Sequence, residues 1–103
     1  MTDSRMSDKP PAGQFRLLYF ASAASFTRKS SDHFSAPLPI ADLFYVIETK
    51  HPGITNAVLS SAAVTVNLDY VDVDEDGQTF GNQKSIVIKE GDEVAIIPPV
   101  SSG

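Results

Sequence analysis

The 103-residue sequence contains no cysteine. It can therefore form neither disulfides nor cysteine-ligated zinc sites, and it has no thiolate nucleophile, which fits a reducing cytosol. No apolar run approaches the roughly 20 residues of a membrane-spanning helix, and residues 1–13 lack the apolar segment of a secretory signal. Basic residues are few, and a net charge of −5 disfavours nucleic acid and anionic membranes as partners. We expect a cytosolic protein that binds neither.

The chain has the length of a single domain. We expect residues 1–13 to form a disordered arm, residues 14–98 the folded domain and residues 99–103 an extended tail. Alternating or short apolar runs bounded by turn residues predict strands within residues 14–22, 32–39, 62–73, 85–88 and 91–97. In the third of these segments, Val64, Val66 and Leu68 are expected on one face.

The segment PIADLFYVIETKH predicts the principal helix. Its apolar residues recur at i, i+3, i+4 and i+7, namely Ile40, Leu43, Phe44 and Ile47. A proline suits the helix entry, and Pro52-Gly53 ends the helix. Shorter helical segments are predicted within residues 21–29 and 54–62. The order of elements argues for an α+β fold in which the helix packs on one face of a sheet.

The acidic segment DVDEDGQTFGNQ partly matches a calcium-binding EF-hand loop. Asp72, Asp74, Asp76 and Gly77 occupy the first, third, fifth and sixth positions. The twelfth position holds Gln83 instead of the bidentate glutamate, and the flanking segments are strand-like where an EF-hand has helices. We therefore favour a solvated acidic hairpin loop and expect no metal site.

The two histidines, His33 and His51, belong to no recognisable catalytic motif. Serines and aspartates are plentiful, so a Ser-His-Asp arrangement stays open. The sequence has neither a G-x-S-x-G nucleophile turn nor a glycine-rich phosphate loop. It predicts no self-contained active site.

The C-terminal segment has the composition of a narrow, extended tail made of Pro98, Pro99, Val100, Ser101, Ser102 and Gly103. The prolines end the last strand and hold the chain extended. The four residues after them reach on the order of 14 Å, and their small side chains suit a narrow channel. The terminal carboxylate is a poor electrophile, but conversion to an acyl-adenylate by ATP would expose its carbonyl to a sulfur nucleophile. A final glycine alone carries little information, because glycine makes up about 7% of residues.

As a whole, EGDEVAIIPPVSSG resembles the C-terminus of the small, sulfur-carrying subunits of molybdopterin synthase, a ubiquitin-like β-grasp family. The resemblance extends to FRLLYFA, ETKHPG and VTVNLDYV, and it spans about residues 14–103. It implies a mixed sheet of about five strands packed on the principal helix. Ser102 stands where the family usually has glycine. Serine is disfavoured by about 1–2 kcal/mol in a left-handed conformation, but it is small, and we expect function to be retained.

The resemblance also implies a function. An E1-like enzyme would use ATP to adenylate Gly103 and then convert it to a thiocarboxylate, with no cofactor bound tightly to the chain. The tail would enter the large synthase subunit, which supplies the catalytic side chains, and give its sulfur to cyclic pyranopterin monophosphate in molybdenum cofactor biosynthesis. Two copies of each subunit would form a heterotetramer. Two alternatives stay open: a sulfur carrier for thiamine synthesis or tRNA thiolation, and a non-catalytic ubiquitin-like interaction domain.

A partner interface follows from the β-grasp arrangement, in which the first and last strands are parallel neighbours. Leu18 and Phe20 would lie near Ala95 and Ile97 on the sheet face away from the principal helix, and we expect Tyr70 to join them. Large apolar groups on such a face indicate a partner site. We predict that Phe20, Tyr70 and Ile97 dock the large subunit and direct the tail.

Overall fold

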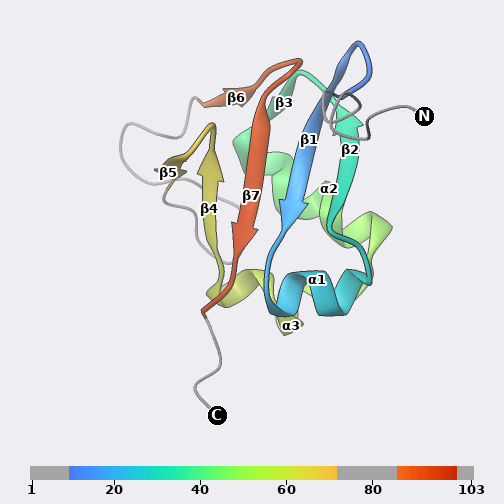
Figure 1. Ribbon diagram of the computed structural model, residues 1–103, viewed down its shortest axis with the longest axis vertical. Coiled ribbons are helices and arrows are strands. Elements are labelled where there is room, and N and C mark those ends of the chain that lie inside the picture. Colours follow the sequence, from blue (N-terminus) through green and yellow to red (C-terminus); the bar gives the residue numbers. More distant parts are fainter. Residues whose placement is uncertain (1–9, 72–85, 100–103) are drawn as a thin grey trace, which may run out of the picture.

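The computed structural model of the chain describes residues 10–71 and 86–99 (Figure 1). A five-stranded mixed sheet has the strand order β2-β1-β7-β4-β5, and a separate two-stranded sheet pairs β3 with β6. The strands are β1 (Gln14–Tyr19), β2 (Ser31–Ser35), β3 (Leu38–Pro39), β4 (Ala63–Val66), β5 (Asp69–Val71), β6 (Val87–Ile88) and β7 (Glu93–Ile97). The helical elements are α1 (Ser22–Thr27), η2 (Ile40–Asp42), α2 (Leu43–Lys50), α3 (Ile54–Ala57) and η3 (Leu59–Ser61). The predicted α+β class and the mixed five-stranded sheet are confirmed.

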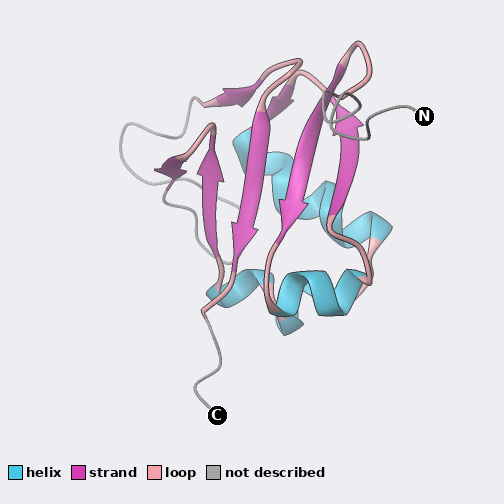
Figure 2. Ribbon diagram, in the orientation of Figure 1, coloured by secondary structure: helices cyan, strands magenta, loops and turns pink. Residues whose placement is uncertain are grey.

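The core lies between the sheet and the helices, which Figure 2 shows behind the sheet and across its lower end. Alternation along the strands decides which side chains enter it. In β1, Leu17 is fully buried, and it pairs in register with Val94 of β7, which is also fully buried. The apolar face of the predicted principal helix covers these residues through Leu43 and Ile47, both fully buried. The prediction of this helix is confirmed.

Glu48 fixes the corner where α2 ends. Its carboxylate accepts hydrogen bonds from the backbone N–H groups of Gly53 (2.7 Å) and Thr55 (3.0 Å). These bonds lower the pKa of Glu48, and the bond from Gly53 has the largest effect. Gly53 has φ 93°, a left-handed conformation that glycine adopts without strain, and this explains why the helix stops at Pro52-Gly53.

The segment predicted as one strand over residues 62–73 contains a hairpin turn instead. Asn67 and Leu68 both have positive φ, 51° and 76°, and the chain reverses there from β4 into β5. A two-residue hairpin turn of type I′ needs positive φ at both central residues. The expectation that Leu68 shares the core face with Val64 and Val66 is therefore wrong: Leu68 is 83% exposed.

A buried carboxylate joins the edge of the sheet to the helices. Asp32 on β2 accepts hydrogen bonds from the Tyr19 hydroxyl (2.8 Å), Lys29 Nζ (2.6 Å) and Lys50 Nζ (2.8 Å), and it bonds to His51 Nε2 (2.9 Å). Burial alone would raise the pKa of Asp32, but these hydrogen bonds, led by those of the lysines, hold it well below its usual range. Burial, then the hydrogen bond to Asp32, raises the pKa of Tyr19. The cluster therefore combines an ionised Asp32 with a protonated Tyr19.

We predict that Asp32→Asn destabilises the fold in a pH-dependent way. Removing one partner of a buried ion pair costs about 3–5 kcal/mol, so the free energy of unfolding at pH 7 should fall by about 3 kcal/mol. The folded pKa of Asp32 lies below the unfolded value of about 3.9, so the stability it contributes is present above that value and is lost as the pH falls. The stability difference between the two proteins should narrow below about pH 5.

Urea unfolding between pH 7 and pH 3 measures this difference. Asp42→Asn is the matched control, because Asp42 is exposed, and this variant should stay close to the unaltered protein throughout. A constant gap between Asp32→Asn and the unaltered protein over the whole range would contradict the assignment of an ionised, stabilising Asp32.

Candidate functional site

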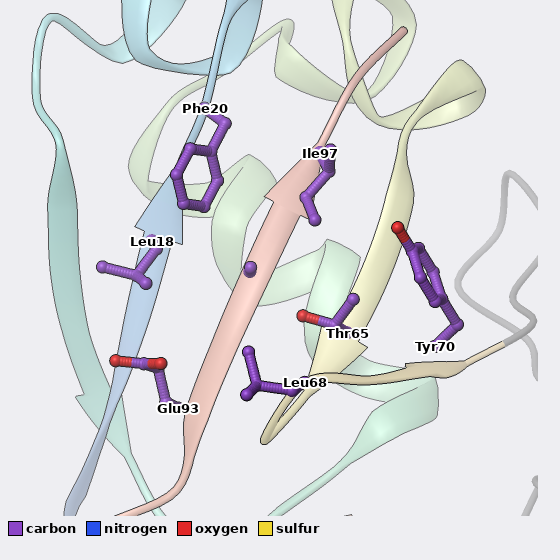
Figure 3. Close-up of a pocket in the computed structure, with 8 residues that line it drawn as sticks. Leu18, Phe20, Thr65, Leu68, Tyr70, Glu93 and Ile97 are labelled. Carbon is purple, nitrogen blue, oxygen red and sulfur yellow. The ribbon is translucent and has the colours of Figure 1, made fainter.

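An open groove of about 280 Å³ lies on the sheet face turned away from the core (Figure 3). Its strand residues alternate with core residues: Leu18 follows the buried Leu17, and Ala95 follows the buried Val94. We call this surface the open face. The groove is lined by Leu18, Phe20, Thr65, Leu68, Tyr70, Glu93, Ala95 and Ile97.

Residues that pair across four neighbouring strands form a row along the groove. Leu18 of β1 pairs with Ala95 of β7, Ala95 pairs with Thr65 of β4, and Thr65 pairs with Tyr70 of β5. Ala95 and Thr65, with exposed fractions of 7% and 5%, form the floor. Phe20 and Tyr70 are 47% and 66% exposed and stand at the sides. The result is a mostly apolar hollow with large side chains accessible from solvent.

The three residues predicted for the partner interface come together here. Phe20, Ile97 and Tyr70 all line the groove, although they are far apart in the sequence (Figure 3). The expected parallel pairing of β1 and β7 accounts for the first two. Tyr70 also lies on the expected face, because the hairpin returns β5 beside β4 and pairs Tyr70 with Thr65. Alternation along one unbroken strand would have placed Tyr70 on the core face with Val64. Their docking role stays a prediction.

Phe20 has a fixed position at the end of β1. Its backbone N–H donates to the carbonyl oxygen of Ile96 at 3.2 Å, which continues the pairing with β7 by one residue. Ala21 follows with φ 51° and ψ −127°, a backbone conformation that residues other than glycine rarely adopt. The chain then enters α1 and leaves the sheet. Phe20 is therefore placed at the end of the open face where β1 and β7 finish.

The tail begins at the same end of the sheet. β7 ends at Ile97, Pro98 is buried against the body, and Pro99 is exposed. Figure 1 shows the chain leaving the bottom of β7, where β1 also ends. The predicted tail residues Val100, Ser101, Ser102 and Gly103 lie outside the described residues, as does the acidic loop considered for calcium.

Sequence reasoning missed Thr65, Leu68 and Glu93 as lining residues. Leu68 was assigned to the core because the apolar alternation of the sequence continues across the turn. The signal for the turn is the Asn67-Leu68-Asp69 sequence, since Asn and Asp favour tight turns. Glu93, at the start of β7, lies at the end of the groove away from Phe20 and accepts a hydrogen bond from Arg16 Nη1 at 3.2 Å.

The two histidines lie in different surroundings. His51 belongs to the Asp32 cluster, and His33 is exposed on β2. Over residues 10–71 and 86–99, no group of three or more His, Asp or Glu side chains is placed to hold a metal ion. Within the same part of the chain, no helix has the length and apolar character needed to cross a membrane.

Comparison with known proteins identifies the family. The ThiS family matches residues 17–103. The molybdopterin synthase sulfur carrier subunit of Phaeosphaeria nodorum is 54% identical over 97 residues, which cover 94% of this chain and 98% of that protein. The one from Homo sapiens is 37% identical over 95 residues, covering 90% and 98% of the two chains.

Solved structures agree on the fold. A putative molybdopterin converting factor subunit 1 from Pyrococcus furiosus has a TM-score of 0.65 at 21% identity, with 84% of this chain and 98% of that chain covered. A chain of the complex of subunits 1 and 2 of molybdopterin-converting factor from Helicobacter pylori has a TM-score of 0.56 at 17% identity, with coverage of 87% and 99%. The chain therefore belongs to the ThiS family of ubiquitin-like β-grasp proteins, among the sulfur carrier subunits of molybdopterin synthase.

Proposed function

We propose that the chain carries sulfur as a thiocarboxylate on Gly103. In the first step, the carboxylate of Gly103 attacks the α-phosphorus of ATP on an E1-like enzyme, and pyrophosphate leaves. In the second step, a sulfur nucleophile attacks the acyl-adenylate carbonyl and displaces AMP. ATP is thus a substrate of the activating enzyme and not a cofactor held by this chain. The match to the ThiS family extends through residue 103, which supports this assignment.

The thiocarboxylate would then be delivered to the large subunit of molybdopterin synthase. We propose that this subunit docks on the open face through Phe20, Tyr70 and Ile97 and receives the tail in its active site. There the sulfur passes to cyclic pyranopterin monophosphate, in a cytosolic heterotetramer with two copies of each subunit. The Helicobacter pylori chain of similar fold comes from a complex of subunits 1 and 2 of molybdopterin-converting factor, which supports a partner of this kind.

One observation carries the proposal: the end of the groove formed by Phe20 and Ile97 lies where the tail begins. Phe20 and Ile97 end neighbouring parallel strands, and the tail follows Ile97 directly through Pro98 and Pro99. The last four residues can extend on the order of 14 Å beyond Pro99. A partner held on the groove is therefore within reach of Gly103, and the folded body supplies docking in place of catalytic side chains.

We predict that activation adds sulfur only to an unblocked Gly103. Co-expression with the activating enzyme and a sulfur source should raise the intact mass by about 16 Da, the difference between sulfur and oxygen at the activated carboxyl. One alanine added after Gly103 should abolish the increase, because the reactive carboxyl is displaced. Intact-protein mass spectrometry measures both. An equal increase in the extended protein would place the sulfur elsewhere and contradict the proposal.

We predict that a charge placed in the groove prevents docking. Phe20→Asp should abolish co-purification with the large subunit, because it replaces a half-exposed ring with a carboxylate that must lose its hydration on burial. Tyr45→Asp is the control: Tyr45 is 73% exposed on α2, on the other side of the sheet. This variant should bind normally. Unchanged co-purification of Phe20→Asp would contradict docking on the open face.

A further inference from the structure

Leu68 is in an unfavourable place for the isolated protein. Its side chain is 83% exposed, so its apolar surface gains little from folding. Its φ of 76° lies in the left-handed region, which is disfavoured for residues with a side chain and suits glycine at this position of a hairpin turn. Folding therefore gives this side chain little benefit, while its left-handed backbone imposes a cost that a glycine would avoid. Local stability does not explain a leucine here.

The turn that carries Leu68 is fixed to the neighbouring strand. The backbone N–H of Asn67 donates to the carbonyl oxygen of Glu93 at 2.7 Å, and the backbone N–H of Glu93 donates to Asn67 Oδ1 at 3.0 Å. Asn67 Nδ2 also donates to Asp92 Oδ1 at 3.1 Å. Because these bonds tie the hairpin to the start of β7, the position of Leu68 is set before any partner arrives. Preorganisation of this kind lowers the entropic cost of binding.

The direction of the side chain places it in the groove. Figure 3 shows Leu68 beside Thr65 and Glu93, at the end of the groove away from Phe20 and the tail. Leu68 thus extends the apolar lining from the tail end to the opposite end of the open face. The charged group beside it in the groove is Glu93, which is partly exposed and paired with Arg16 at 3.2 Å.

We propose that Leu68 is a second anchor for the large subunit, which binds it with an apolar surface. The inference rests on the proposed docking of that subunit and adds a contact beyond Phe20, Tyr70 and Ile97. Anchors at both ends of the groove fix the orientation of the body as well as its position. The tail is then directed by a two-point contact. Leu68 is retained for binding, against its cost to the free protein.

The proposal requires Leu68→Gly to change stability and affinity in opposite directions. Without partner, the melting temperature should rise by about 2–4 °C, because relief of the left-handed strain outweighs the extra conformational entropy that glycine loses on folding. The dissociation constant for the purified cognate large subunit should increase about tenfold or more, because the apolar contact is lost. Leu68→Asn keeps a residue that tolerates positive φ but is polar, and it should weaken binding similarly. Calorimetry measures both quantities.

Phe20→Asp, measured in parallel, separates the possible failures. If Leu68→Gly binds as tightly as the unaltered chain while Phe20→Asp does not bind, the anchor role is overturned and the proposed docking stands. If Leu68→Gly lowers the melting temperature and the affinity together, Leu68 is a structural residue and the inference is also overturned. If Phe20→Asp and Leu68→Gly both bind like the unaltered chain, docking on the open face itself fails.

Discussion

The parallel pairing of β1 with β7 is the constraint on which the rest of this structure depends. The register runs from Arg16 opposite Glu93 to Tyr19 opposite Ile96, so both strands end at one edge of the sheet. Neighbouring parallel strands have their C-terminal ends at the same edge of the sheet, whereas antiparallel strands would have them at opposite edges. Phe20 and the base of the tail are adjacent for this reason. The strand topology therefore places one end of the docking groove beside the base of the tail that carries the proposed reactive end.

The two faces of the sheet have different roles: one packs in the core, and the other carries the groove. The core face packs on the helices, and the Asp32 cluster ties the edge strand β2 to the end of α2, so the body has little need of its open face for stability. The open face is consequently available for large apolar side chains, and it can carry residues that cost the free protein something. Leu68 is the clearest case, since it combines exposure with a left-handed backbone. A chain whose proposed role is delivery needs a rigid body and a prepared contact surface.

Much of this arrangement could be predicted from the sequence, because burial on one face imposes a period of two on strands and of 3.6 on helices. Those periods located β1, α2 and β7, and the family resemblance supplied the parallel pairing. The β4–β5 hairpin was missed because Leu68 and Tyr70 continue the apolar alternation of Val64 and Val66 in the sequence. The two-residue turn reverses the phase, so both residues lie on the opposite face from Val64. The Asp32 cluster was missed for another reason. Its partners, from Tyr19 to His51, are spaced without any local pattern and meet only in the folded chain.

The most direct measurement of the coupling between groove and tail is a methyl NMR titration of the labelled chain with the large subunit. We predict that signals from Leu18 and Ile97 in the groove shift together with that from Val100, with a single saturation point. Signals from Ile40 and Ile54, which are buried in the core, should stay in place. A shift of Val100 alone, with the groove methyls unchanged at saturation, would mean that the tail binds without the open face and would contradict this account.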